Sequence, residues 1–250
     1  GFEGNDYTND ELPYARRVAD RYGTRHEELW VRPHMADVLP KLVRHYGEPF
    51  GDGSAIPTYY ISQAARQHVT VVLTGDGGDE LFGGYGWYQR FAAFDLRREL
   101  GQTWGDGLRR STGYLRSLDP WRALGTVKGA AAWTGHLMQM QRNPVTRYGQ
   151  QTAYFQDDLR QRIYTAQVRN SLGPIDPLRV YHDRNGQATG WESLDRIFYL
   201  DHTTYLPDDI LAKVDIASMA CSLETRPPFL DHRLVELAAS LPVSTKVSDG

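Results

Sequence analysis

The stretch VTVVLTGDGGDELFGGY, residues 69–85, indicates more about the fold than any other part of this 250-residue chain. Its first residues form a short apolar, β-branched run, which is typical of a strand that is buried on both faces. The run ends at Thr74 in a glycine-rich turn, and a helical pattern follows. A strand that stops in such a turn before a helix presents backbone N–H groups to an anion.

Two carboxylates in this turn, Asp76 and Asp79, indicate which kind of anion it holds. They would repel a bare phosphate, whereas a phosphate that is accompanied by a divalent cation fits between them. We therefore interpret the turn as a site for a Mg²⁺-bound nucleotide. The alternative is an ordinary strand–turn–helix connection in which Asp79 caps the helix. The turn matches neither the G-x-G-x-x-G dinucleotide fingerprint nor the P-loop, and no lysine or arginine lies between His68 and Arg90.

The composition is that of a soluble globular protein. Apolar residues make up 40% and charged residues 24%, and 28 basic against 31 acidic residues give a formal charge of −3. No basic block favours nucleic acid as a partner. No apolar run is long enough to span a bilayer and no signal peptide is seen, so we expect no membrane partner. The single cysteine, Cys221, fits a reducing compartment, and we expect a cytoplasmic location.

The order of patterns in the first ninety or so residues predicts an α/β fold. Amphipathic segments alternate with short apolar runs, as in a parallel sheet that carries helices on its faces. We expect helices over residues 10–22 and 35–46, a third helix from Ser54 or Thr58 to about Gln67, and strands over residues 24–31 and 69–73. In the helix at 35–46, the residues expected to face inward are Val38, Leu39, Leu42 and Val43.

The rest of the chain predicts mainly helices. We divide the chain into a nucleotide-binding α/β part (1–94), a variable helical part (95–190) and a helical substrate-side part (191–250). In the last part we expect a new helix to start at Pro207 and a final helix over residues 230–241.

Charged residues alternate with apolar positions between residues 206 and 242, and they are candidates for contacts with a substrate. The candidates are Lys213, Asp215, Glu224 and Arg226. Two interpretations stay open: structural ion pairs that orient helices, or a substrate pocket that faces the nucleotide turn. The eight histidines lack the spacing of a metal site, and Cys221 fits a small buried thiol better than a nucleophile.

Several segments carry a resemblance to a known family. LTGDGGDELFGGY (73–85) and LPDDILAKVDIASMACSLETRPPFLDHRLVELAASLP (206–242) resemble the synthetase domain of glutamine-dependent asparagine synthetases. Upstream of the turn, YARRVADRYGTRHEEL, LPKLVRHYGEPFGDGSAIPTYYIS and ARQHVTVVL are also similar to that family. The resemblance covers residues 1–94 and 192–242. It implies a parallel sheet of the ATP-pyrophosphatase type, which is adenine nucleotide alpha hydrolase-like, with an extensive helical C-terminal part.

The resemblance also implies an ATP-dependent ligase and amidotransferase. In that family the side-chain carboxylate of aspartate attacks the α-phosphate of ATP, and ammonia from a separate glutaminase domain then displaces AMP from the acyl-adenylate. ATP and Mg²⁺ are the cofactors that it implies, and a homodimer is one option for the oligomeric state.

The resemblance assigns roles to the residues of the turn. Asp79 is a magnesium ligand, and Asp76 takes the catalytic position of a carboxylate, often a glutamate, that is tied to formation and capture of the adenylate. The residues implied to line the ATP are Thr74, Gly75, Asp76, Gly77, Gly78 and Asp79.

Parts of the family's pattern are not found in these 250 residues. They include a pyrophosphate loop with another magnesium-binding aspartate, a lysine that steadies pyrophosphate, and the cysteine nucleophile of the glutaminase domain. We therefore expect an excised part of a longer protein, which makes no asparagine by itself and whose sheet has an exposed edge or altered pairing that invites self-association.

The sequence departs from the family's pattern at Ile216, where relatives commonly place arginine, and at Gly53, where they commonly place proline. Ile216 removes a positive charge next to the expected pocket, which leaves the acceptor substrate open. The alternatives to an asparagine synthetase are a related adenylating ligase with another carboxylate, such as one that amidates glycan or peptide precursors or closes β-lactam rings, and a non-catalytic scaffold.

Overall fold

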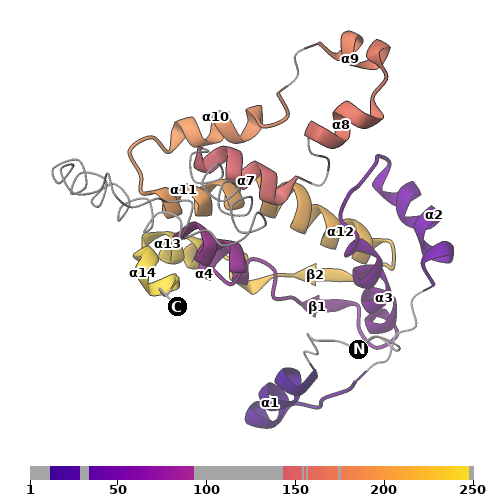
Figure 1. Cartoon of the computed structure of the whole chain (residues 1–250). Coiled ribbons are helices and arrows are strands. Elements are labelled where there is room, and N and C mark those ends of the chain that lie inside the picture. Colours follow the sequence, from indigo (N-terminus) through magenta and orange to yellow (C-terminus); the bar gives the residue numbers. More distant parts are fainter. Residues whose placement is uncertain are drawn as a thin grey trace, which may run out of the picture. The chain divides into compact units, whose positions relative to one another are not determined.

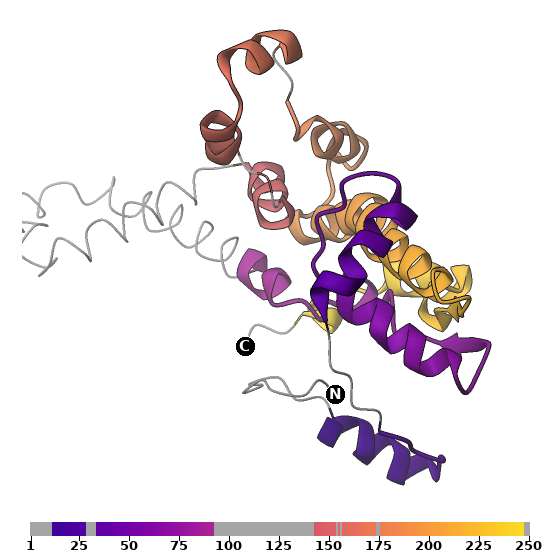
Figure 2. The same ribbon diagram turned by 90° about the vertical axis from the view of Figure 1, so that its right-hand side faces the viewer.

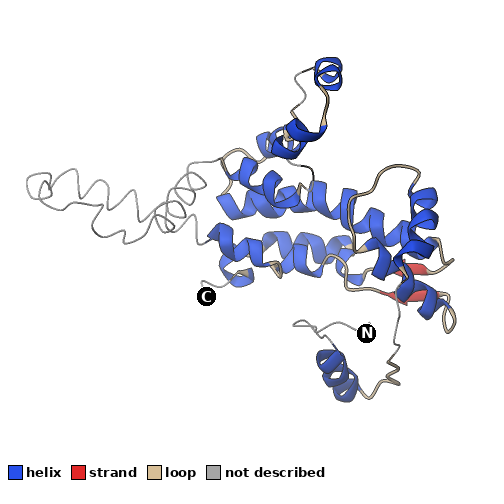
Figure 3. Cartoon of the chain, turned by 45° about the vertical axis from the view of Figure 1, so that its right-hand side comes forward, coloured by secondary structure: helices blue, strands red, loops and turns tan. Residues whose placement is uncertain are grey.

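The chain divides into two compact units, and each unit has its own apolar core. The computed structural model describes residues 12–28, 34–92, 143–153, 155, 157–173 and 176–247. Helices dominate these residues, and their strands form one small sheet (Figures 1 and 3). The units are Gly1–Asp76 with Pro207–Pro228, and Gly77–Leu206 with Phe229–Gly250.

The first unit begins with three helices and a strand. They are α1 (Leu12–Tyr22), α2 (Met35–Tyr46), α3 (Ala55–Arg66) and β1 (Val71–Leu73). The three expected helices are thus confirmed within the described residues. α2 ends at Gly47, which takes a left-handed conformation (φ 71°) and donates its N–H to the carbonyl of Val43. This is a cap geometry that favours glycine.

A segment from late in the chain completes the first unit. A π-helix (Asp201–Leu211), which begins in the second unit, leads into α12 (Ala212–Met219) and then β2 (Glu224–Arg226). α3 and α12 pack side by side, as the two views in Figures 1 and 2 show. The core that they form with α2 consists of Val38, Leu42, Ala55, Tyr59 and Ala217.

Only part of the inward face predicted for α2 is buried. Val38 and Leu42 are buried as expected, whereas Leu39 and Val43 are more than half exposed. The expectation for Leu39 and Val43 is therefore wrong in this structure. The apolar face of α2 is wider than the part of the helix that the core of this unit covers.

β1 and β2 form a parallel pair, and it is the one sheet found in the described residues. The register places Val71 opposite Glu224 and Leu73 opposite Arg226. A parallel sheet is therefore confirmed, although it is smaller than the sequence predicts. We did not predict β2, because its three residues are mostly charged and do not alternate with apolar ones.

The expectation that the first strand is buried on both faces is wrong. Val71 and Leu73 share one face of β1, and Leu73 is 74% exposed. A buried parallel strand needs helices on both faces of its sheet, and the described residues do not cover this face.

The strand expected over residues 24–31 is not formed over residues 24–28. Arg25 pairs there with Glu27, and Glu28 pairs with Arg16 of α1. No strand of the described chain offers this segment a backbone ladder. Residues 29–31 lie outside the described residues.

The second unit consists of helices around an aromatic core. Residues 86–92 are helical. The helices with both ends in the described residues are α4 (Gly78–Phe82), α7 (Pro144–Thr152), α8 (Asp157–Ile163), α9 (Ala166–Leu172), α10 (Arg179–Gln187), α11 (Ser193–Leu200), α13 (His232–Ser240) and α14 (Val243–Lys246). Large side chains of the core include Tyr88, Tyr148, Ile197, Phe198 and Leu200. The helical character predicted for the variable part is confirmed from residue 143 onward, and residues 93–142 lie outside the described residues.

The end of the chain differs from the sequence-based expectation in two ways. Pro207 does not start a helix, because it lies inside the π-helix that joins α11 to α12 without a break. Proline has no backbone N–H and so interrupts the hydrogen bonds of an α-helix. Here the interruption falls in a segment with the wider π-helical hydrogen bonding.

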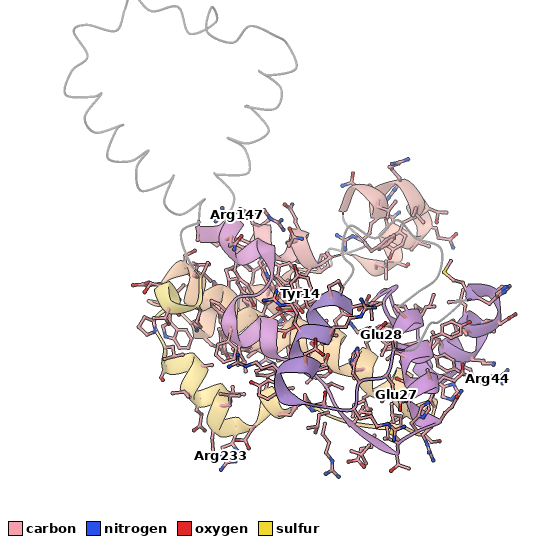
Figure 4. All side chains as sticks on the ribbon, turned by 90° about the horizontal axis from the view of Figure 1, so that it is seen from below. Tyr14, Glu27, Glu28, Arg44, Arg147 and Arg233 are labelled. Atoms are coloured by element: carbon pink, nitrogen blue, oxygen red, sulfur yellow. The ribbon has the colours of Figure 1, made fainter. Side chains whose placement is uncertain are left out.

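The expected last helix is α13, which follows a 3₁₀ turn at Pro228–Leu230, and α14 comes after it. Asp231 accepts the N–H of Arg233 at the start of α13 and pairs with its exposed guanidinium. Figure 4 labels Arg233 on this helix. None of the helices in the described chain has the length and hydrophobicity to cross a lipid bilayer.

Candidate functional site

The acidic turn begins where β1 ends, beside β2. The N–H of Thr74 donates to the carbonyl oxygen of Arg226 at 3.0 Å and extends the strand pairing by one residue. Arg226 and Glu224 lie two residues apart on β2, so their side chains share a face, and Nε of Arg226 lies 2.7 Å from Oε1 of Glu224. The fold thus brings two of the predicted substrate-side residues next to the strand that leads into the turn.

The hydroxyl of Thr74 is buried without a hydrogen-bond partner among the described residues. Buried hydroxyl groups are normally satisfied, and leaving one unpaired costs roughly 1–3 kcal/mol. Gly75 follows, and an added Cβ there would meet no atom within 4 Å. The turn thus begins with an unpaired hydroxyl and a glycine that has open space beside it. Asp76, which is half-buried, ends this half of the turn.

The second half of the turn belongs to the second unit and depends on glycine. Gly77 has a φ of 90°, and an added Cβ would lie 2.3 Å from Cδ2 of Leu230, so a side chain is excluded on both grounds. Gly78 opens α4, with the ring of Phe229 3.5 Å from an added Cβ. These glycines allow the backbone of the turn to pack closely on the segment that precedes α13.

α4 presents one carboxylate to solvent and buries the next. Asp79 is exposed, whereas Glu80 is 1% exposed and accepts a hydrogen bond from the hydroxyl of Tyr85 at 2.6 Å. Burial raises the pKa of Tyr85 most, and the hydrogen bond to Glu80 and the negative charge of Glu80 raise it further. The carbonyl oxygen of Glu80 lies 3.1 Å from Nε2 of His202, and burial lowers the pKa of this histidine. Glu80 therefore anchors α4, while the carboxylate of Asp79 stays exposed.

Lys213, one of the predicted substrate-side residues, is committed to a buried ion pair. Its Nζ lies 3.0 Å from Oδ2 of Asp52, and both side chains are about one-tenth exposed. Burial by itself would raise the pKa of Asp52, but the hydroxyl and N–H of Ser54 and the charge of Lys213 outweigh it and lower the pKa. Burial and then the charge of Asp52 raise the pKa of nearby Asp209. The pair fastens α12 to the loop before α3.

The remaining candidates lie on or near α12. Asp215 is exposed in its first turn, and Ile216 beside it is half-buried. Cys221 follows the helix, and burial raises the pKa of its thiol, in agreement with a partly buried, unreactive cysteine. Within the part of the chain that the structure describes, no three histidine, cysteine, aspartate or glutamate side chains gather as for a metal ion.

A further buried carboxylate, which the sequence analysis missed, lies in the core of the second unit. Asp201 accepts hydrogen bonds from the hydroxyls of Tyr88 and Tyr148 and from the indole N–H of Trp87. Burial raises its pKa to about 6, against the opposing effect of these three donors. Asp52 and Glu80 were missed as well. The sequence signal for all three is weak, because their partners come from distant segments or from neutral side chains.

A mostly helical chain with a small parallel sheet, whose first strand leads into a glycine-rich turn, is an α/β protein. Comparison with known proteins identifies its family. The chain belongs to the asparagine synthase family, whose model, described as "Asparagine synthase", matches residues 1–250. The resemblance that the motifs indicate is thereby confirmed.

Individual relatives agree with the family match. The chain is similar to "Asparagine synthetase [glutamine-hydrolyzing] 1" of Bacillus subtilis, with 28% identity over 252 residues, which cover 100% of this chain and 37% of the relative. A "Putative asparagine synthetase [glutamine-hydrolyzing]" of Mycobacterium bovis is 30% identical over 256 residues, with 99% of this chain and 35% of the relative covered.

A third relative, "Putative asparagine synthetase [glutamine-hydrolyzing] 2" of Methanocaldococcus jannaschii, is 44% identical over 101 residues, which cover 40% of this chain and 19% of the relative. The chain spans about a third of the length of the Bacillus and Mycobacterium relatives, at 37% and 35%.

Proposed function

We propose that the chain is part of the synthetase domain of an ATP-dependent ligase, which forms asparagine from aspartate with ammonia that a glutaminase domain takes from glutamine. The family match over the whole chain and the names of the relatives support this proposal. The structural observation that carries it is the buried, unpaired hydroxyl of Thr74 at the start of the acidic glycine turn. We propose that β1 and β2 belong to a sheet of the ATP-pyrophosphatase type.

The residues of the turn fit a Mg²⁺-bound nucleotide in their chemistry. Thr74 offers a hydroxyl that lacks a partner in the described residues, and Gly75 leaves room for a phosphate to approach the backbone. Asp79 would hold the metal, because an exposed carboxylate is the ligand type that Mg²⁺ prefers. When bound, Mg²⁺ supplies positive charge that neutralises the phosphates.

The proposed reaction has two steps. The side-chain carboxylate of aspartate attacks the α-phosphate of ATP, which gives β-aspartyl-adenylate and pyrophosphate, and ammonia then displaces AMP. Thr74, Gly75, Gly77 and Gly78 position the nucleotide in this proposal, and Asp76 serves formation and capture of the adenylate. The chain contributes mainly orientation and electrostatic stabilisation.

The acceptor substrate is proposed to bind on the side of β2. Arg226 is 65% exposed and pairs with Glu224, so its guanidinium is able to exchange this partner for the carboxylate of a substrate. Asp215 is exposed at the start of α12 and is a second candidate for this side. Lys213 has a different part in the proposal: its buried pair with Asp52 orients α12.

A related ligase that adenylates another carboxylate is the second candidate. The observation that favours it is Ile216, a half-buried apolar residue where relatives commonly place arginine. The complete gene product, with whatever residues flank these 250, is assayed for ATP-dependent pyrophosphate release with aspartate and with a panel of other carboxylates. We expect release and asparagine formation with aspartate and glutamine. Release with another carboxylate only would favour the second candidate, and no release with any would leave a non-catalytic scaffold.

The 250 residues by themselves are expected to make no asparagine. The proposed site holds one magnesium ligand, Asp79, and the family's pyrophosphate loop is not found in this sequence. ATP-dependent synthesis of asparagine by the purified chain would contradict this expectation.

A further inference from the structure

The residues that follow α4 fold back and contact Asp79, which lies in the first turn of this helix. α4 has five residues and ends at Gly83, whose left-handed conformation (φ 72°) turns the chain back. The N–H groups of Gly83 and Gly84 then donate to the carbonyl oxygen of Asp79, at 2.9 and 3.1 Å. This double contact brings the Cα of Gly84 against the side chain of Asp79. All three residues belong to the second unit, so the contact is internal to it.

The carboxylate of Asp79 occupies the space that a side chain at residue 84 would need. An added Cβ on Gly84 would lie 1.8 Å from Oδ1 of Asp79 and 2.8 Å from its Cγ. Atoms that are not bonded do not approach so closely, so the carboxylate would have to move by more than about 1 Å and take another rotamer. The conformation of Gly84 does not require glycine, because Gly84 is not among the residues with positive φ. The added Cβ would also lie 3.2 Å from the Cα of Asp79, so the backbone has to yield slightly, whereas the carboxylate has to leave its position altogether.

We propose that Gly84 is a positioning residue for the metal ligand: the missing side chain at residue 84 sets the direction in which Asp79 presents its carboxylate. Gly84 touches neither metal nor nucleotide in this account and acts through Asp79, so the inference rests on the proposed function. Supporting residues of this kind typically change metal affinity by about 10- to 100-fold.

The neighbouring glycines have different requirements, which makes the inference specific. Gly83 is fixed by its positive φ, and an added Cβ would also lie 2.8 Å from Cγ2 of Val247, so it is a structural glycine. Gly86 has open space, since the nearest atom to an added Cβ is Nη1 of Arg90 at 4.0 Å. Gly86→Ala is therefore a control for the effect of Gly84→Ala on Mn²⁺ affinity, two residues away at the start of the helical residues 86–92.

The test measures the affinity of the complete gene product for Mn²⁺ in the presence of ATP, by the electron paramagnetic resonance signal of free Mn²⁺. We expect Gly84→Ala to weaken Mn²⁺ binding by about 10- to 100-fold, while the variant still folds cooperatively. Gly86→Ala is expected to leave the Mn²⁺ affinity unchanged. An unchanged Mn²⁺ affinity in Gly84→Ala would overturn the inference, and so would failure of this variant to fold, since Gly84 would then be structural.

A double-mutant cycle with Asp79→Ala shows whether Gly84 acts through Asp79. If it does, Gly84→Ala weakens Mn²⁺ binding in the wild-type background and has no further effect when Asp79 is already alanine. An undiminished effect in the Asp79→Ala background would contradict the inference. If Asp79→Ala by itself leaves Mn²⁺ affinity unchanged, the proposed function of the turn fails instead, so the two failures are distinguishable.

Discussion

Asp201 has no exposed surface, and replacing it by asparagine is expected to remove a defined part of the pH dependence of stability. Burial, together with the charge of Glu80, raises the pKa of Asp201 from 3.8 to about 6, although Tyr88, Tyr148 and Trp87 donate hydrogen bonds to it. A difference of about two pKa units corresponds to about 3 kcal/mol.

The sign of the effect follows from the direction of the shift. Because the pKa of Asp201 is higher in the folded protein than in the unfolded chain, the folded state binds the proton more tightly between pH 4 and pH 6. The contribution of this group to the free energy of unfolding is therefore greatest below pH 4. It falls by about 3 kcal/mol as the pH rises through this window, and it is constant above it.

Urea unfolding at a series of pH values from 4 to 7.5 measures this contribution. Pulse hydrogen exchange of α11 peptides, with labelling at one fixed pH, restricts the readout to the unit that contains Asp201. We expect Asp201→Asn to flatten the pH dependence by about 3 kcal/mol relative to wild type. Asp208→Asn, at an exposed position, is the control and is expected to keep the wild-type profile. An Asp201→Asn profile that is parallel to wild type would refute the reasoning.

Two further changes test how the first unit is held together. Lys213→Met leaves Asp52 buried without a counter-charge, so we expect it to lower the free energy of unfolding by about 3–5 kcal/mol in urea titrations. Adding Asp52→Asn is expected to recover most of this loss. A loss below about 1 kcal/mol in Lys213→Met would show that the pair is dispensable. Ser222 has a φ of 57°, a left-handed conformation that glycine adopts more easily than other residues. Ser222→Gly is therefore expected to raise the free energy of unfolding by about 1 kcal/mol, whereas Ser222→Ala gives no gain. Equal stability of the two variants would contradict this.

The elements that sequence analysis predicted correctly are those whose signals are local. α2 and α3 follow from apolar residues at helical spacing, and the stop of α2 at Gly47 follows from a single residue. β2 was missed because Glu224 and Arg226 become a strand only when β1 offers them a backbone ladder from far away in the sequence. The exposure of Leu73 was missed because the burial of a strand depends on elements from distant parts of the chain, which its own apolar sequence does not identify.

In the candidate site, too, the residues with a local sequence signal were predicted, and the contacts between distant segments were not. The turn was predicted from its glycine spacing and from Asp76 and Asp79, which need no distant partner to be recognised. The pairing of Lys213 with Asp52 and the contact of His202 with Glu80 join segments that are far apart in the chain. No periodicity marks such contacts, because they depend on how the helices pack. The closeness of Gly84 to Asp79 depends on a backbone conformation at Gly83 that the sequence permits but does not specify.

The most direct test of the account is the affinity of the complete gene product for ATP, measured by calorimetry with and without Mg²⁺, in wild type and in Asp79→Ala. The account predicts ATP binding that depends on Mg²⁺ and that weakens at least about tenfold, or about 1.4 kcal/mol, in the variant. The exposed helix residue Asp37 provides the control, and Asp37→Ala is expected to bind as wild type does. Binding that is independent of Mg²⁺, or equal in wild type and Asp79→Ala, would contradict the account.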